Sequence, residues 1–370
     1  MDNILHICVV AGARPNFMKV APLVWAVRNN RLEHPVNLHL VYTGDENDLD
    51  LEPTLLADLA LAKEEVCFLG VVSNRMNELT GRVMEAFDLY LEQHPAQIVV
   101  VVDDLASTLA AAIVTKKRGL TLAHLVAGTR SFDITMPKEI NRLVIDGLSD
   151  LLFTAGDGGS SIVSRGGADP SKVFMVGNVL IDTLRQNLPR QQRPALMDEE
   201  TLQEGHYIVL TLNRKALLAD SDRLKPMLLA LTRTAVNTPV IAVLRPDASE
   251  TVRQLLPESH PGLTITKPLS YLEFIYLTSH ARGIVTDSGN VAEEATFNNI
   301  PCITLNSYTE HLETVKQGSN VLVGEDADRL EQALKQMSDG QWKESHLPDR
   351  WDGRSADRII RIIVEELTKH

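Results

Sequence analysis

Short apolar runs alternate with segments of helical periodicity along the first half of the chain. The run at residues 98–102 reads IVVVV, and such a β-branched run is typical of a strand buried on both faces of a parallel sheet. Similar runs lie at residues 5–10, 38–42 and 120–125, and helical spacing lies at residues 17–29 and 106–115. This alternation predicts a doubly wound α/β domain.

The same rhythm restarts after a polar segment. Residues 184–205 are polar and contain two prolines, which indicates a connection into a second domain. Strand-like runs follow at residues 207–211, 240–244, 283–286 and 302–305. Residues 355–367 predict an amphipathic helix with Ser355 as its N-cap. Two α/β domains in one chain place a cleft between them, and ligands of open parallel sheets bind beyond the carboxyl ends of the strands.

Composition and charge narrow the possible partners. Hydrophobic residues make up 44% of the 370 residues and charged residues 23%, which excludes an intrinsically disordered chain. The net charge of −13 repels nucleic acid and acidic membranes. We therefore expect no nucleic-acid partner, and an anionic substrate would need a local cluster of arginine and lysine.

The cysteines and the N-terminal residues bear on the compartment. Cys8, Cys67 and Cys302 are odd in number, widely spaced and without metal-ligand spacing, and two of them lie in strand-like runs. This pattern favours a reduced, cytoplasmic setting. The first ten residues lack the basic leader and cleavage site of a signal peptide, and no window reaches the length of a membrane span.

A basic pair flanks the first predicted strand-to-helix turn. Arg14 lies in the turn and Lys19 lies five positions later, in the first turns of the helix. Both side chains can face an anion in the cleft, where the helix N-terminus adds partial positive charge. A solvated basic pair without a ligand explains the spacing equally well.

A turn of small residues follows the strand at 283–286. Residues 286–290 read TDSGN and open a helix that contains Glu293 and Glu294. Small residues let backbone N–H groups approach a phosphate, Ser288 can add a hydroxyl, and a glutamate one turn later can bind ribose hydroxyls. The alternative is a simple capping turn with Asp or Ser at the N-cap.

Several polar residues follow the strands of the first domain. Asp103 and Asp104 end the most apolar strand, where a carboxylate is a candidate acid or base or, equally, an N-cap for the next helix. His124 ends the following strand, and a lone histidine there is more often structural than catalytic. Glu139 and Arg142 lie in a helix start, where an internal ion pair is the simpler interpretation.

Seven segments together resemble the non-hydrolysing UDP-N-acetylglucosamine 2-epimerases. They lie in the family's order at residues 12–23, 103–112, 123–153, 173–184, 268–277, 284–295 and 352–360. The resemblance implies two Rossmann-like domains with a central cleft, like the GT-B glycosyltransferases, and a homodimer. It places the N-terminal domain at residues 1–176 plus 354–370, with the C-terminal helix crossing back to it, and the UDP-binding domain at residues 177–353.

The family's reaction, as the resemblance implies it, is an anti elimination and re-addition of UDP. A base removes the proton at C2 of the sugar, the C1–O bond to UDP breaks, and a glycal forms. UDP then re-adds while C2 is protonated from the opposite face. This chemistry needs cations on the diphosphate and at least two acid/base groups, and it needs no metal and no redox cofactor.

Residue by residue, the resemblance carries over the half of the site that holds UDP. The matching binding positions are Arg14, Lys19, Ser288, Gly289, Glu294 and Glu313. Asp104 matches a catalytic carboxylate of the family, and Glu139 is the glutamate that remains of the family's Pro-Glu-Glu.

The half that faces the sugar departs from the family pattern. Val126 stands where the family has a catalytic glutamate, and Lys138 stands at the first glutamate of Pro-Glu-Glu. Asn213 replaces a histidine near the diphosphate, and a second family histidine falls at about Leu244. A general acid or base typically contributes 10²- to 10⁴-fold in rate, so we expect little ordinary activity to remain.

Three hypotheses follow from this division. The first is a UDP-sugar-binding protein that has lost ordinary 2-epimerisation, a pseudoenzyme linked to surface-polysaccharide synthesis. The second is an active enzyme with rearranged chemistry, in which Asp103, Asp104, Asp133 or Glu139 supplies the protons. The third is a non-catalytic partner protein that no longer binds the nucleotide.

Overall fold

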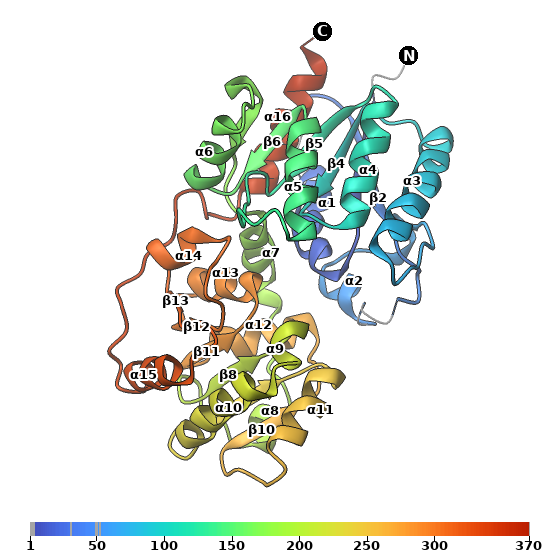
Figure 1. Ribbon diagram of the computed structural model, residues 1–370. Helices are drawn as coiled ribbons and strands as arrows, with labels where there is room; N and C mark the ends of the chain where they lie inside the picture. The colour runs from blue at the N-terminus through green and yellow to red at the C-terminus, as the bar shows by residue number, and fades with distance from the viewer. Residues whose placement is uncertain (1–3, 30–31, 49–50, 52, 370) are drawn as a thin grey trace. The chain divides into compact units, whose positions relative to one another are not determined.

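The computed structural model describes residues 4–29, 32–48, 51 and 53–369 and divides into two compact units. The first unit comprises Met1–Gln186 together with Asp349–His370, and the second comprises Asn187–Pro348. Each unit contains a parallel sheet with helices on both faces (Figure 1). The prediction of two α/β domains is confirmed.

The sheet of the first unit has the strand order β3-β2-β1-β4-β5-β6-β7. Its strands are β1 (Leu5–Ala11), β2 (Val36–Tyr42), β3 (Val66–Phe68), β4 (Ile98–Val102), β5 (Thr121–Leu125), β6 (Leu151–Thr154) and β7 (Val173–Met175). Every residue of β4 is buried, because helices cover both faces of this central strand.

Two layers of helices cover this sheet. The helices are α1 (Arg14–Asn29), α2 (Leu55–Asp58), α3 (Met76–Gln93), α4 (Ala106–Lys117), α5 (Pro137–Leu148), α6 (Asp157–Arg165), α7 (Val179–Asn187) and α16 (Ser355–Thr368), with 3-10 turns at Lys63–Glu65 and Pro170–Lys172. On one face α3, α4 and α5 lie side by side (Figure 1), with Phe87, Ala111 and Ile145 packed on Val99 and Val101. Helix α1 packs on β1 and β2 and also contacts α16.

The sheet of the second unit has the order β10-β9-β8-β11-β12-β13. Its strands are β8 (Ile208–Thr211), β9 (Val240–Val243), β10 (Leu263–Thr266), β11 (Gly283–Thr286), β12 (Cys302–Thr304) and β13 (Asn320–Leu322). Its helices are α8 (Leu196–Glu199), α9 (Lys215–Leu218), α10 (Ser221–Ala235), α11 (Pro246–Leu255), α12 (Tyr271–Ser279), α13 (Gly289–Phe297), α14 (Leu312–Lys316) and α15 (Ala327–Ser338), with a 3-10 turn at Leu188–Arg190.

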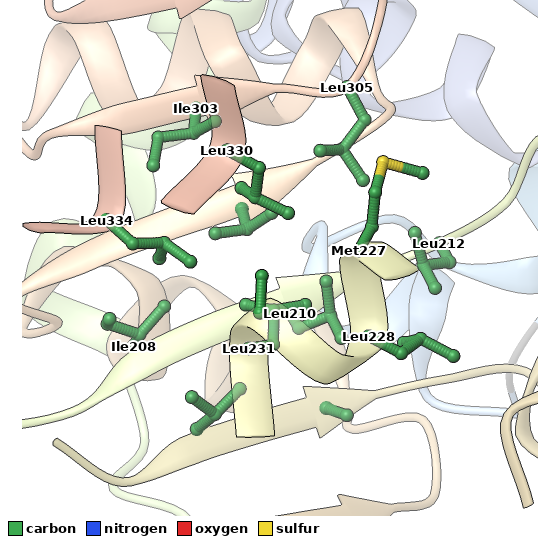
Figure 2. Packing of buried hydrophobic residues seen from close by; sticks show 14 of the residues in the cluster. Ile208, Leu210, Leu212, Met227, Leu228, Leu231, Ile303, Leu305, Leu330 and Leu334 are labelled. Atoms are coloured by element: carbon green, nitrogen blue, oxygen red, sulfur yellow. The ribbon is translucent and has the colours of Figure 1, made fainter. Parts of the chain in front are cut away.

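Alternation along each strand divides the core of this unit in two. Ile208 and Leu210 point toward α10 and α15, where Figure 2 shows Leu231 and Leu334 closing one side of the sheet. Val209 points to the other side, which α12 and α13 cover. Helix α13 therefore lies against this side of the sheet. Only Asp287 and Ser288 separate it from β11, so its N-terminus lies at the end of that strand.

Two details differ from the sequence prediction. The units separate after Gln186 and after Pro348, whereas boundaries at 176/177 and 353/354 were predicted, because α7 packs within the first unit. There the Thr183 hydroxyl donates to the carbonyl of Met18 and Asp182 accepts from the N–H of Ala356. Ser355 is the first helical residue of α16 and not its N-cap, which is Arg354.

Candidate functional site

Polar side chains gather where β1 and β4 of the first unit end. The ammonium of Lys19 lies 2.6 Å from Oδ1 of Asp103, and its side chain is only 6% exposed. The amide of Asn16 donates to Oδ2 of Asp103 at 2.8 Å. The solvated-pair alternative is therefore wrong for Lys19, whereas Arg14 is partly exposed at the first position of α1.

Asp104 lies beside this group and binds a different cation. The Arg142 side chain donates through Nε to Oδ2 of Asp104 at 2.7 Å and also through Nη2. Asp104 and Arg142 are both buried. Neither Asp103 nor Asp104 caps α4, since the N-cap residue is Leu105 and no side chain caps it. The N-cap alternative for these two carboxylates is therefore wrong.

Glu139 has both of its carboxylate oxygens engaged. Oε2 accepts from the backbone N–H and the hydroxyl of Ser131, at 2.8 and 2.9 Å, and lies 3.3 Å from Nη1 of Arg142. Oε1 accepts from the N–H of Phe132 at 3.3 Å. Burial alone would raise the pKa of Glu139, but the bonds from Ser131 and the charge of Arg142 hold it below its usual value. The predicted internal ion pair is present, and Glu139 also anchors the loop before α5.

His124 belongs to a second buried group on the same edge of the sheet. Its Nε2 lies 2.9 Å from the carbonyl oxygen of Asp103, and its Nδ1 lies 2.6 Å from Oδ1 of Asp146. Both ring nitrogens of His124 therefore have a partner within the first unit. Arg130 contacts the other oxygen of Asp146 at 2.6 Å. Burial alone would raise the pKa of Asp146, but His124 and Arg130 hold it low. The structural interpretation of His124 is confirmed.

Two positions that depart from the family pattern lie at this edge. Val126 follows β5 with φ of 65°, a left-handed conformation that a β-branched residue rarely adopts. The Lys138 ammonium lies 3.5 Å from Oδ1 of Asp104, and its side chain is 59% exposed. The edge thus carries a valine without a proton-transfer group and an exposed cation beside a carboxylate.

In the second unit, the predicted phosphate turn forms the start of α13. Ser288 is the N-cap residue, but its side chain makes no capping hydrogen bond, and Gly289 is the first helical residue. The N–H of Ser288 donates to the Thr286 hydroxyl at 3.0 Å. The capping-turn alternative is therefore correct in placing Ser288 at the N-cap, although the Ser288 side chain does not cap the helix. The small residues at this helix start are partly exposed.

Asp287 organises the neighbouring loop after β8. Its carboxylate accepts from the N–H of Asn213 at 3.0 and 2.8 Å and from the N–H of Arg214 at 2.8 Å. Burial raises the pKa of Asp287, and these two N–H groups oppose the shift. The guanidinium of Arg214 in turn bonds to Asn306 at 2.5 Å and Glu325 at 2.6 Å. Asn213 therefore occupies a loop that an internal carboxylate already fixes.

The remaining predicted residues of this unit differ in exposure. Glu294 is buried on α13, Glu313 is partly exposed on α14, and Leu244 is buried after β9. Sequence reasoning missed the pair formed by Glu293 and His311, whose Oε1 and Nδ1 lie 2.8 Å apart beside Gly289. It also missed Asp146, although Asp146 follows Arg142 by one helical turn, a spacing that signals a shared face.

Two negative findings hold for the part of the chain that the structure describes. It contains no group of three or more His, Cys, Asp or Glu side chains that could hold a metal ion. No helix within it has the length and apolar character needed to cross a membrane.

Comparison with known proteins finds relatives over nearly the whole length. The sequence profile described as UDP-N-acetylglucosamine 2-epimerase matches residues 29–364. A UDP-2,3-diacetamido-2,3-dideoxy-D-glucuronate 2-epimerase of Pseudomonas aeruginosa is 31% identical, covering 90% of this chain and 92% of its own. The crystal structure of Methanocaldococcus jannaschii UDP-GlcNAc 2-epimerase with UDP-GlcNAc and UDP is similar with a TM-score of 0.84 and 29% identity, covering 98% of this chain and all of that one.

The fold extends to a more distant protein. A lipopolysaccharide outer core galactosyltransferase has a TM-score of 0.57 at 15% identity, covering 98% of this chain and 100% of that chain, a likeness of fold alone. The expected GT-B-like architecture, with two Rossmann-like domains, is confirmed.

Proposed function

Because the chain belongs to the UDP-N-acetylglucosamine 2-epimerase family, we propose that it binds a UDP-sugar and has lost the ordinary epimerisation at C2 of that sugar. Ser288 and Gly289, at the start of α13, would receive the diphosphate, and Glu294 the ribose. The M. jannaschii relative was crystallised with UDP-GlcNAc and UDP, which supports a ligand of this class.

The observation that carries the loss of epimerisation is the engagement of Glu139. Its oxygens accept from Ser131 and Phe132 and contact Arg142, so proton transfer at a sugar carbon would require breaking these buried contacts. A carboxyl group whose pKa is held low is also a poor general acid at neutral pH. Val126, at the position that matches a catalytic glutamate of the family, carries no proton-transfer group.

Binding and chemistry are tested separately. Calorimetry with UDP and UDP-GlcNAc is expected to detect binding to the purified protein. NMR of UDP-GlcNAc incubated with the protein in D₂O is expected to find no deuterium at C2, because a solvent-exchanging base is required for its entry. A relative that epimerises serves as the positive control for exchange. Deuterium at C2, or accumulation of UDP-ManNAc, would refute the loss of activity, and absence of any binding heat would refute the UDP-sugar ligand.

Lys138 favours a second candidate, an enzyme with rearranged acid/base groups. Its ammonium is exposed and lies 3.5 Å from Asp104, so the two groups are close enough to act on one substrate. A panel of UDP-sugars tests this alternative. UDP release or a new sugar product that disappears in Lys138→Met, with UDP binding unchanged, would favour it over the first proposal.

We further propose a homodimer that contacts through α5 of the first unit. Ile140, Leu143 and Val144 share one face of this helix and are 46%, 45% and 37% exposed. An exposed apolar stripe of this kind suits a self-complementary interface. Light scattering is expected to give twice the chain mass, and Leu143→Glu is expected to give the monomer. A monomeric wild-type protein would contradict the dimer.

We also propose a place in surface-polysaccharide synthesis, by analogy with sugar nucleotides that relatives act upon. Deleting the gene in its host is expected to change the surface polysaccharide. An unchanged polysaccharide would contradict this role.

A further inference from the structure

A cavity of about 600 Å³ opens at the surface of the second unit, beside the loop that follows α15. Asn299, Pro301 and residues 342–346 line it. The lining is mostly polar, with amide, hydroxyl, imidazole and carboxylate groups beside the indole of Trp342. Lys343 brings an amine to this lining, so a nucleophilic group borders a space that small molecules can enter.

The loop that carries Lys343 is fixed on both sides of that residue. Before it, Nε1 of Trp342 donates to the carbonyl oxygen of Ser319 at 2.8 Å. After it, the hydroxyl of Ser345 donates to Oδ1 of Asn299 at 2.5 Å. The position of the amine at the wall of the cavity is therefore set by the fold.

The ammonium of Lys343 has an uncharged partner. It is partly buried and donates to the carbonyl oxygen of Val315 on α14 at 2.5 Å. A carbonyl carries only partial negative charge, so it offsets the burial of an ammonium less than a carboxylate would. Burial accordingly lowers the pKa of Lys343 from its usual value. The titratable groups on the segments around it are Glu313, Lys316, Glu344 and His346.

We propose that Lys343 is an acylation site, at which its amine accepts an acetyl group from a thioester or an acyl phosphate. The ammonium first releases a proton to water. The neutral Nζ then attacks the acyl carbon, the bond from that carbon to sulfur or to phosphate oxygen breaks, and the thiolate or phosphate leaves with the electron pair. The nitrogen releases a second proton to water, and an amide remains.

The product suits the place where it forms. The amide retains one N–H, which can still donate to the carbonyl of Val315. Acetylation removes the charge that burial disfavours, and the cavity has room for the added group. The fold therefore both increases the neutral fraction of this amine and accommodates the amide. This modification goes beyond the proposed function and does not depend on a UDP-sugar.

The experiment compares two lysines of the same chain. The whole protein is incubated at about pH 7.5 with acetyl-CoA in one arm and acetyl phosphate in the other. Mass spectrometry of its peptides gives the rate at each lysine. Lys343 is expected to react about threefold or more faster than Lys335 in at least one arm, because a lower pKa leaves more neutral amine. Lys335 is exposed on α15, so accessibility alone would favour it.

Two further measurements connect this preference to the fold. The rate at Lys343 is expected to rise with pH and to level off at a lower pH than the rate at Lys335. In urea that unfolds the chain, the two rates are expected to become equal. Ser345→Ala removes a bond that fixes the loop, and it is expected to reduce the ratio of rates while the circular dichroism spectrum stays unchanged.

The outcomes decide the inference without reference to the sugar nucleotide. Equal rates at Lys343 and Lys335 in the native protein, with both donors, overturn the acylation site. A preference for Lys343 that persists in urea also overturns it, since it would come from local sequence and not from the cavity. Calorimetry with UDP-GlcNAc is a separate measurement, so failure here leaves the proposed function standing.

Discussion

The carboxyl edges of the two sheets differ in the groups that they carry. In the first unit, Asp104 and Glu139 are buried and share the guanidinium of Arg142. In the second unit, the start of α13 presents small residues, Ser288 and Gly289, over a helix N-terminus. The first edge is filled by ion pairs of the chain itself, whereas the start of α13 at the second edge is lined by small, partly exposed residues.

This difference bears on how easily each edge can rearrange and how easily it can accept an anion. A buried ion pair fixes its members, since removing either partner leaves an uncompensated charge in a poorly solvated place. A helix start lined by small residues carries only partial charge and tolerates arrival of an anion at little cost. The first unit therefore resists rearrangement, and the start of α13 suits the anionic ligand that we propose.

The largest expected effect comes from breaking the ion pairs of the first edge. Arg142→Met leaves Asp104 and Glu139 buried without their shared cation, so we expect a loss of about 3–5 kcal/mol in the free energy of unfolding. Urea denaturation measures the loss. Arg223→Met is the matched control in the second unit, because its side chain is 62% exposed against Glu325 and such pairs contribute at most about 1 kcal/mol. Equal losses of unfolding free energy in Arg142→Met and Arg223→Met would contradict the difference between the two edges.

A second test asks whether cations, and not burial alone, keep carboxylates ionised in the first unit. Asp182 is buried with the Ala356 N–H at 2.8 Å, and burial raises its pKa from 3.8 to about 6. The native state then binds more protons than the unfolded state between these values, so stability declines as pH rises through about 6. Asp182→Asn cannot ionise and is expected to be more stable than the wild type above that pH by about 2–3 kcal/mol.

Thermal unfolding between pH 4 and pH 8 measures this difference. Asp169→Asn is the control of opposite sign, since bonds from Ser171 lower the pKa of that exposed carboxyl. Its replacement is expected to remove stability at neutral pH and to have no effect in acid. If the stability difference between Asp182→Asn and the wild type does not change with pH, burial does not raise the pKa of Asp182.

A third test narrows the space at the second edge. A Cβ at position 289 would lie 2.6 Å from the His311 ring, which Glu293 holds in place. Gly289→Ala is therefore expected to cost about 1–3 kcal/mol of stability and to weaken UDP-GlcNAc binding. Gly81→Ala on α3 meets no atom within 4 Å and is expected to be neutral or stabilising. Unchanged stability and binding in Gly289→Ala would mean that this edge is looser than described.

The smallest expected effect concerns backbone strain at the first edge. Val126 has φ of 65°, which costs a β-branched residue about 1–2 kcal/mol. Val126→Ala removes the branched side chain and keeps the penalty, whereas Val126→Gly relieves it. We expect the glycine variant to be more stable than the alanine variant by about 1 kcal/mol in urea denaturation. The reverse order would show that the conformation is not strained.

The fold could be predicted from the sequence because local patterns of residues indicate its strands and helices. A run such as IVVVV at 98–102 fits only a strand covered on both faces, and the structure has it as β4 with every residue buried. The boundary between the two units could not be predicted, because the apolar residues of α7 do not by themselves indicate which unit the helix packs in. Long-range contacts of Asp182 and Thr183 decide the matter.

The candidate site was only partly readable for a related reason. The sequence identified Asp104 and Arg142 as polar residues near strand and helix ends, but not that they bind one another across 38 positions. The same limit applies to His311 and Glu293, which are 18 positions apart on different helix starts. A sequence motif shows which residue types occur at a turn. Which charged residues pair depends on which turns the fold places next to one another.

Helix α16 makes the first unit discontinuous in the order of synthesis. Ile359, Ile360 and Ile363 are buried on a helix that packs against α1, although more than 300 residues separate the two in the chain. A ribosome therefore completes the whole second unit before the first can close its apolar layer over α1. The nascent chain must carry that uncovered surface through most of translation, so we expect this layer to be open to chaperones and to aggregation before it folds.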